Sequence, residues 1–92
     1  MKNKYNDTKL AEEFDLIILT KDSGDMKKGA IGTLIYSYTG ETKPLYVLFL
    51  DENDKHFERK VYFDEFRVLN ERDDNDLPLI VEYMKEHRCV AV

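Results

Sequence analysis

The chain has 92 residues, 42% hydrophobic and 12% aromatic, with 19 acidic and 14 basic side chains and a net charge of −5. This length supports one compact core and excludes two separate ones. The aromatic content also exceeds that of disordered, highly charged chains, so we expect a single domain that folds without cross-links.

Hydropathy and cysteine usage predict a cytoplasmic protein. The first 20 residues lack the apolar stretch of a secretory signal, and Cys89, the single cysteine, has no partner for an internal disulfide. The longest uninterrupted apolar run, 45–50, is far shorter than the ~20 residues that span a bilayer. We therefore expect a reducing compartment and no membrane contact.

The N-terminal segment, residues 1–13, is polar and mixed in charge. Thr8 could cap a single helical turn within it, because a hydroxyl can accept an otherwise unpaired backbone N–H. The first strand is predicted over 14–20, where four consecutive apolar residues begin at Leu16. Such a run is typical of a short strand that is buried on both faces.

A loop and a bent strand are expected next. Residues 21–28 contain a glycine and several turn formers, which indicates a loop. A strand over 30–38 follows, with Gly29 and Gly32 at its entry. Glycine at these positions permits either a positive φ or the close approach of a second backbone. Both faces of this strand carry apolar side chains, as expected where a bent strand contributes to two parts of a small barrel.

The middle of the chain predicts three more strands. Residues 45–50 are apolar throughout and should form a central strand, followed by a five-residue connection over 51–55. Residues 56–63 alternate with period two, the pattern of a strand with one face in water. A tight turn at 64–66 and a short closing strand at 67–69 complete the set.

A charged linker and a helix end the chain. Residues 70–76 carry a net charge of −3 and finish at Asp76, which can act as an N-cap. Pro78 suits the first turn of a helix because its missing N–H would be unpaired there. The helix is predicted over 77–88, with one apolar stripe that needs either the domain or a partner to pack against: Leu77, Ile80, Val81 and Met84.

This order of elements predicts a mainly β (α+β) fold, a small SH3-like five-stranded barrel with a C-terminal helix. The expected organisation has four parts: a polar N-terminal segment at 1–13, the SH3-like barrel at 14–69, an acidic linker at 70–76, and the C-terminal helix and tail at 77–92.

Four short runs support a resemblance: FDLIILT at 14–20, KGAIGTL at 28–34, YVLF at 46–49 and FRVL at 66–69. Together they are similar to an uncharacterised bacterial family of short SH3-like proteins. The K-x-G-x-x-G-x-hydrophobic pattern from Lys27 also resembles the opening of a KOW-type half-barrel. That resemblance implies an alternative function as an accessory module that binds RNA, the ribosome or the transcription machinery, with Lys27, Lys28 and the Gly29–Gly32 turn at the contact.

The distribution of charge favours a different partner. Residues 1–46 carry 7 acidic and 7 basic side chains, whereas residues 47–92 carry 12 acidic and 7 basic ones. Such a field repels nucleic-acid phosphates and speeds the approach of a cationic protein. The leading hypothesis is therefore a protein-binding module for a basic partner, such as an immunity protein or antitoxin that neutralises a basic toxin. The predicted partner-binding residues are Asp51, Glu52, Asp54, Tyr62, Glu71, Asp73, Asp74 and Asp76.

No pattern of catalytic or metal-binding residues stands out. His56, His87 and Cys89 are too few for a closed zinc site of histidine and cysteine alone, and the acids at 51–54 lack the glycine and distant glutamate of an EF-hand loop. Nothing in the spacing brings His56 to Cys89 as a nucleophile pair. We expect a protein without enzymatic activity, cofactor or metal, which is a monomer or, through the helix stripe, a homodimer.

Overall fold

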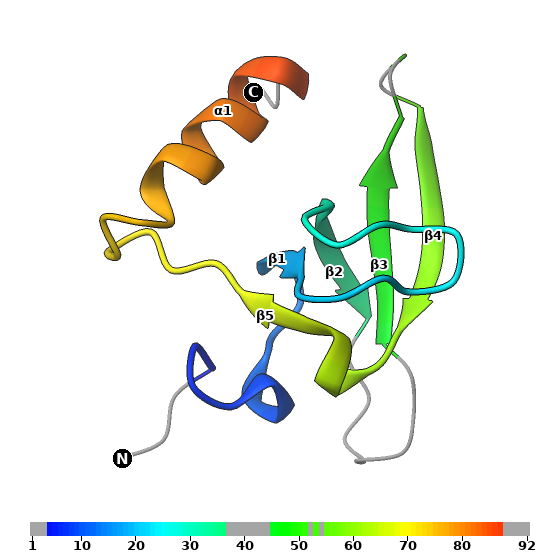
Figure 1. The fold of residues 1–92 in the computed structure, drawn as a ribbon, viewed down its shortest axis with the longest axis horizontal. Coiled ribbons are helices and arrows are strands. Elements are labelled where there is room, and N and C mark those ends of the chain that lie inside the picture. The colour runs from blue at the N-terminus through cyan, green and yellow to red at the C-terminus, as the bar shows by residue number, and fades with distance from the viewer. Residues whose placement is uncertain (1–3, 37–44, 52, 54, 88–92) are drawn as a thin grey trace.

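The described residues form five strands, two short 3-10 helices and one α-helix (Figure 1). The structure is a computed structural model that describes residues 4–36, 45–51, 53 and 55–87. In chain order the elements are η1 (Thr8–Leu10), β1 (Leu16–Leu19), β2 (Ile31–Tyr36), β3 (Leu45–Leu50), β4 (His56–Val61), η2 (Phe63–Glu65), β5 (Phe66–Val68) and α1 (Leu77–His87).

The strands form one antiparallel sheet in the order β4-β3-β2-β1-β5. Strand β2 serves both halves of it, because residues 31–33 pair with β1 and residues 33–36 pair with β3 across an irregularity between Leu34 and Tyr36. The mainly β fold with a C-terminal helix is thus confirmed. The word barrel fits only loosely, since the sheet is not closed: β4 and β5 are its edges, and η2 joins them.

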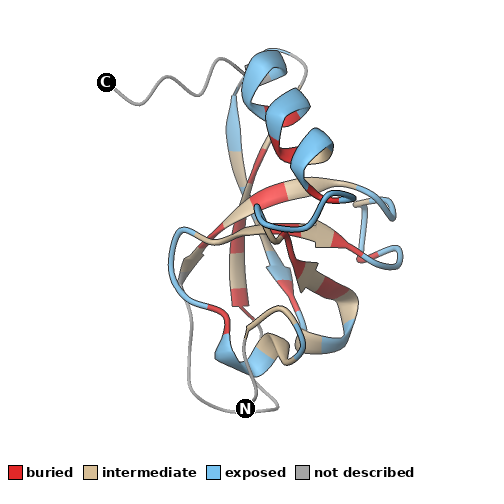
Figure 2. Ribbon diagram, turned by 90° about the vertical axis from the view of Figure 1, so that its left-hand side faces the viewer, coloured by how far each residue is buried: buried red, intermediate tan, exposed pale blue. Residues whose placement is uncertain are grey.

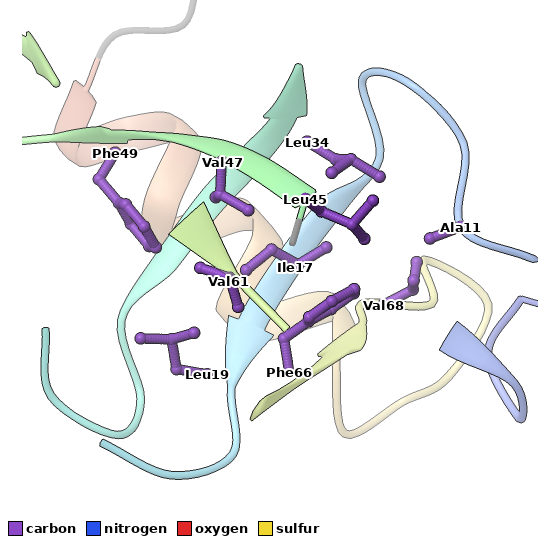
Figure 3. Packing of buried hydrophobic residues seen from close by; sticks show 10 residues of the cluster. All are labelled: Ala11, Ile17, Leu19, Leu34, Leu45, Val47, Phe49, Val61, Phe66 and Val68. Atoms are coloured by element: carbon purple, nitrogen blue, oxygen red, sulfur yellow. The ribbon is translucent and has the colours of Figure 1, made fainter. Parts of the chain in front are cut away.

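The core lies between the two halves of this bent sheet, where side chains from every strand converge (Figure 3). Strand β3 shows how it is built, because its alternate residues Leu45, Val47 and Phe49 are buried while their neighbours are half-buried. Each such side chain contributes about 1.5–3 kcal/mol on burial. The cluster consists of Ala11, Ile17, Leu19, Leu34, Leu45, Val47, Phe49, Val61, Phe66 and Val68.

The burial patterns refine two predictions for single strands. Strand β1 buries Ile17 and Leu19 while Leu16 and Ile18 are half-buried, so the prediction of burial on both faces holds only in part. Strand β4 has the predicted wet face, since its residues alternate between exposed and more buried along its length.

The N-terminal segment packs on the sheet. Asp7, and not Thr8 as predicted, caps η1, because its side chain accepts the backbone N–H of Lys9. The Thr8 hydroxyl instead donates to the carbonyl of Phe63 over 2.9 Å, and Ala11 joins the core. The predicted strand end at 37–38 and the tail after residue 87 lie outside the described residues.

The two glycines before and within β2 have the two distinct roles that the sequence allowed. Gly29 has a φ of 95°, a conformation that side chains rarely adopt. Gly32 pairs with Ile17, and a Cβ there would lie 2.7 Å from a Val47 methyl and 2.9 Å from the Leu48 carbonyl oxygen of the neighbouring strand β3. The close approach of the strands therefore requires glycine at 32.

We expect Gly32→Ala to lower the free energy of unfolding by about 2 kcal/mol, because the added methyl overpacks against β3. Gly24→Ala is the matched control, since its Cβ would meet nothing within 4 Å and only its φ of 58° is strained. It should cost about 1 kcal/mol. Urea unfolding of both variants measures the difference, and equal losses would contradict this explanation.

Candidate functional site

Asp76 ties the beginning of α1 to strand β5. Its two carboxylate oxygens accept bidentate hydrogen bonds from Arg67 over 2.8 and 2.9 Å, and one of them also accepts the backbone N–H of Asn70 over 2.9 Å. The hydrogen bond from Arg67 holds the pKa of Asp76 below its ordinary value. This buried carboxylate, only 2% exposed, thereby fixes where the helix leaves the sheet.

This geometry corrects the prediction that Asp76 binds a partner. A buried carboxylate that already accepts three hydrogen bonds cannot meet an incoming protein. Its predicted role as the helix cap is also modified. The Asp76 carbonyl accepts the first helical hydrogen bond, from Ile80, but its side chain turns back toward the linker and β5.

Helix α1 packs through one face and leaves an apolar stripe in solvent. Ile80 and Tyr83 are buried against the domain, whereas Leu77, Val81 and Met84 are 44%, 42% and 47% exposed. Figure 2 shows the same division, because the buried residues of the helix face the sheet and the exposed residues face away from it. The predicted stripe is therefore split. Ile80 packs on the domain together with Tyr83, which the spacing did not include, and the other three positions stay accessible.

Phe14 is the most exposed large apolar side chain of the described residues, at 75%. It also has a φ of 70°, the one positive φ outside glycine in the described part of the chain. Phe14 stands third in a turn closed by the hydrogen bond from the Asp15 N–H to the Glu12 carbonyl, a position that glycine or asparagine normally fills. A bulky residue with this backbone is a genuine outlier.

Asp15 and strand β2 hold this turn in place. The Asp15 carboxylate accepts the Glu12 backbone N–H and the Lys4 ammonium, each over 2.8 Å. On the other side, the Phe14 N–H donates to the Leu34 carbonyl, and the Leu34 N–H donates to the Asp15 carbonyl. The bond to Asp15 also raises the pKa of Lys4. Strained conformations persist where surrounding contacts over-determine them, as these do.

A groove of about 290 Å³ lies between this turn and α1. Its walls combine three charged side chains, Lys4, Asp15 and Glu71, with six apolar ones. Lys4 and Asp15 form an ion pair with each other, whereas Glu71, the other carboxylate in the groove wall, has no ion pair among the described residues. The apolar lining consists of Tyr5, Phe14, Leu16, Leu69, Ile80 and Met84. We call this the helix groove.

The predicted acidic site is not one patch. Glu71, Asp73 and Asp74 share the exposed turn between β5 and α1, and Glu71 also lines the helix groove. The connection between β3 and β4, which contains Asp51, lies on the opposite side of the molecule (Figure 1). Glu52 and Asp54 fall outside the described residues.

Asp51 and Tyr62 have positions of their own, apart from that turn. The Asp51 carboxylate closes the β3–β4 turn by accepting the N–H groups of Lys55 and Asn53, and these bonds lower its pKa. Tyr62 is exposed between β4 and η2, at the end of the sheet far from α1 in Figure 1. Neither residue therefore lies beside the helix groove.

Of the two lysines beside the glycine turn, Lys27 has an ion pair and Lys28 has none among the described residues. Lys27 lies 3.9 Å from Asp22, and Arg59, which reaches the same loop from β4, forms a bidentate pair with Asp25. Lys21 pairs with Asp64 over 3.0 Å.

Within the described ranges, no group of three or more histidine, cysteine, aspartate or glutamate side chains could hold a metal ion. Nor is any helix in that part of the chain long and apolar enough to cross a membrane. No protein-family model matches the sequence, and comparisons with curated proteins and with solved structures found no match.

Asp76 provides a test of how α1 is attached. Asp76→Asn removes the charge that pairs with Arg67 and should lower the free energy of unfolding at pH 7 by about 1–3 kcal/mol. Asp74→Asn makes the same change on the exposed turn and should have little effect.

The effect of Asp76→Asn should depend on pH. Because the folded-state pKa of Asp76 is lowered, its contribution is present above the ordinary carboxyl value of 3.8 and is lost as the pH falls through the folded value. Wild type and Asp76→Asn should therefore converge in stability below that value. Urea unfolding should give a smaller difference between the two proteins at pH 3 than at pH 7, and a constant difference would contradict the role of the ion pair.

Proposed function

We propose that the protein is a non-enzymatic binding module whose helix groove takes up a basic protein partner. One observation carries this proposal: Phe14 is 75% exposed on a backbone with a φ of 70°, beside the exposed stripe of α1. A left-handed conformation costs about 1–2 kcal/mol for a residue with a side chain. The exposed ring gains no hydrophobic free energy on folding that would offset this cost, whereas burial of the ring by a partner would supply it.

The groove has the anatomy of a binding hot spot. Large aromatic side chains at the centre of an interface carry most of the binding free energy when they enter a water-free pocket. Phe14 can act as such an anchor, and Met84 and Val81 extend the apolar surface along α1. Methionine adapts to partners of irregular shape because its side chain is unbranched and polarisable.

Charge supports a basic partner. The turn between β5 and α1 presents Glu71, Asp73 and Asp74 next to the groove, and none of them has an ion pair among the described residues. Acids at the rim of an interface speed association with a cationic protein more than they tighten the final complex. Neutralisation of a basic toxin by an immunity protein or antitoxin is the specific form of this function that we propose.

Phe14→Gly should separate stability from binding. Glycine relieves the positive φ, so the free energy of unfolding should stay equal or rise by about 0.5–1 kcal/mol after the entropy cost of glycine. Affinity for the purified basic partner, identified by capture from the source cells, should fall at least about tenfold. Calorimetric titration measures the affinity and urea unfolding the stability.

Leu10→Ser is the matched control, because Leu10 is exposed outside the groove and should leave affinity unchanged. Unchanged affinity of Phe14→Gly would overturn the groove as the binding site. An acidic captured partner, or a second copy of this chain seen by sedimentation with Phe14 at the contact, would overturn the basic partner.

Asp73→Asn with Asp74→Asn tests the electrostatic part. The double variant should associate more slowly with the basic partner at low salt, with a weaker dependence on salt and a nearly unchanged dissociation rate. Glu58→Lys makes the same change of two charge units on the exposed face of β4 and serves as the control. Association rates that do not respond to salt in any variant would contradict steering by this turn.

A further inference from the structure

A second cavity, of about 280 Å³, lies on the opposite flank of α1 from the helix groove. Its floor comes from the start of β2 and the end of β3, and its wall from the helix. The floor and wall are apolar apart from two carboxylates on the helix. The lining consists of Met26, Gly29, Ala30, Ile31, Phe49, Leu50, Leu79, Tyr83, Glu82 and Glu86. We call this the sheet cavity.

The two carboxylates stand in an unfavourable arrangement. Glu82 and Glu86 are four residues apart on one helix face, where like charges repel. Glu86 is also in the last turn of α1, where the helix dipole disfavours a negative charge. Neither has an ion pair among the described residues, and no basic side chain lines the cavity. A cation placed between them would relieve both penalties.

We infer that the sheet cavity receives an arginine side chain. The apolar floor suits the methylene stem of a long basic residue, which buries its stem while its charged head reaches polar groups. The planar guanidinium can bridge two carboxylates and stack on an aromatic ring, here Tyr83, in ways that an ammonium cannot. The volume is at the lower limit of drug-sized ligand sites and suits a single side chain.

This inference rests on the proposed function only for the source of the arginine, which would be the basic partner. Because the helix groove and the sheet cavity flank the same helix, one partner could hold α1 from both sides. The cavity itself can be tested without the partner. Failure of one site therefore leaves the other standing.

The experiment is a titration of the full chain, labelled with 15N, with n-butylguanidinium. Saturable shifts should appear at the amides of Ala30, Ile31, Leu50 and Tyr83, with a dissociation constant on the order of millimolar. The neutral isostere n-butylurea should produce no saturable shift, and n-butylammonium should bind more weakly. At high salt the guanidinium affinity should decrease.

Glu82→Gln with Glu86→Gln should weaken n-butylguanidinium at least about tenfold while leaving the free energy of unfolding unchanged or raised, because the repulsion on α1 is removed. Glu58→Gln with Asp74→Asn is the control of equal charge and should bind as wild type does. Phe14→Gly should also bind the probe normally.

Three results would overturn the inference: no saturable shift in wild type, equal binding of n-butylurea, or equal binding by the glutamine variant. Tighter binding of n-butylammonium would overturn the assignment to arginine in favour of lysine. If the probe does not bind in the sheet cavity but Phe14→Gly still lowers the affinity for the basic partner, the proposed function stands without the second site.

Discussion

The bidentate pair between Asp76 and Arg67 sets the geometry on which both candidate surfaces depend. It fixes the start of α1 against the end of β5, and the helix then lies on the domain through little more than Ile80 and Tyr83. Both residues are outside the main cluster that holds the sheet together. The helix is therefore an attached element with two flanks, one facing the N-terminal turn and the other facing the ends of β2 and β3.

The sheet and the flanks of α1 differ in how well their local interactions agree with the fold. The sheet is built without evident compromise, with glycine where strands approach closely and alternating burial along β3. Around α1, by contrast, an aromatic ring is in water on a strained backbone, and two glutamates repel each other near the negative end of the helix dipole. Deviations of this kind are expected at functional sites and rare elsewhere.

Sequence reasoning reached the strands and the helix because their signals are local. The apolar run at 45–50 and the helical spacing after Pro78 each depend on neighbours within a few residues, and both predicted elements agree closely with β3 and α1. The pattern could not show which side of the helix would meet the domain, so Tyr83 was missed. Nor could it show that Phe14, the first residue of the strand predicted over 14–20, stands in a turn held by contacts to Lys4 and Leu34. These depend on residues distant in the chain.

The position of Asp76 was missed for a similar reason, because sequence proximity and charge say nothing of burial. In the sequence Asp76 cannot be distinguished from its acidic neighbours in the linker. In the fold it is buried, because its carboxylate is hydrogen-bonded to Arg67 on β5. The open sheet has a further consequence. Strand β4 is an edge, and its outward residues His56, Glu58 and Lys60 are polar and exposed along its whole length. Charged side chains on an edge strand discourage another chain from extending the sheet, so self-assembly by strand addition is disfavoured there.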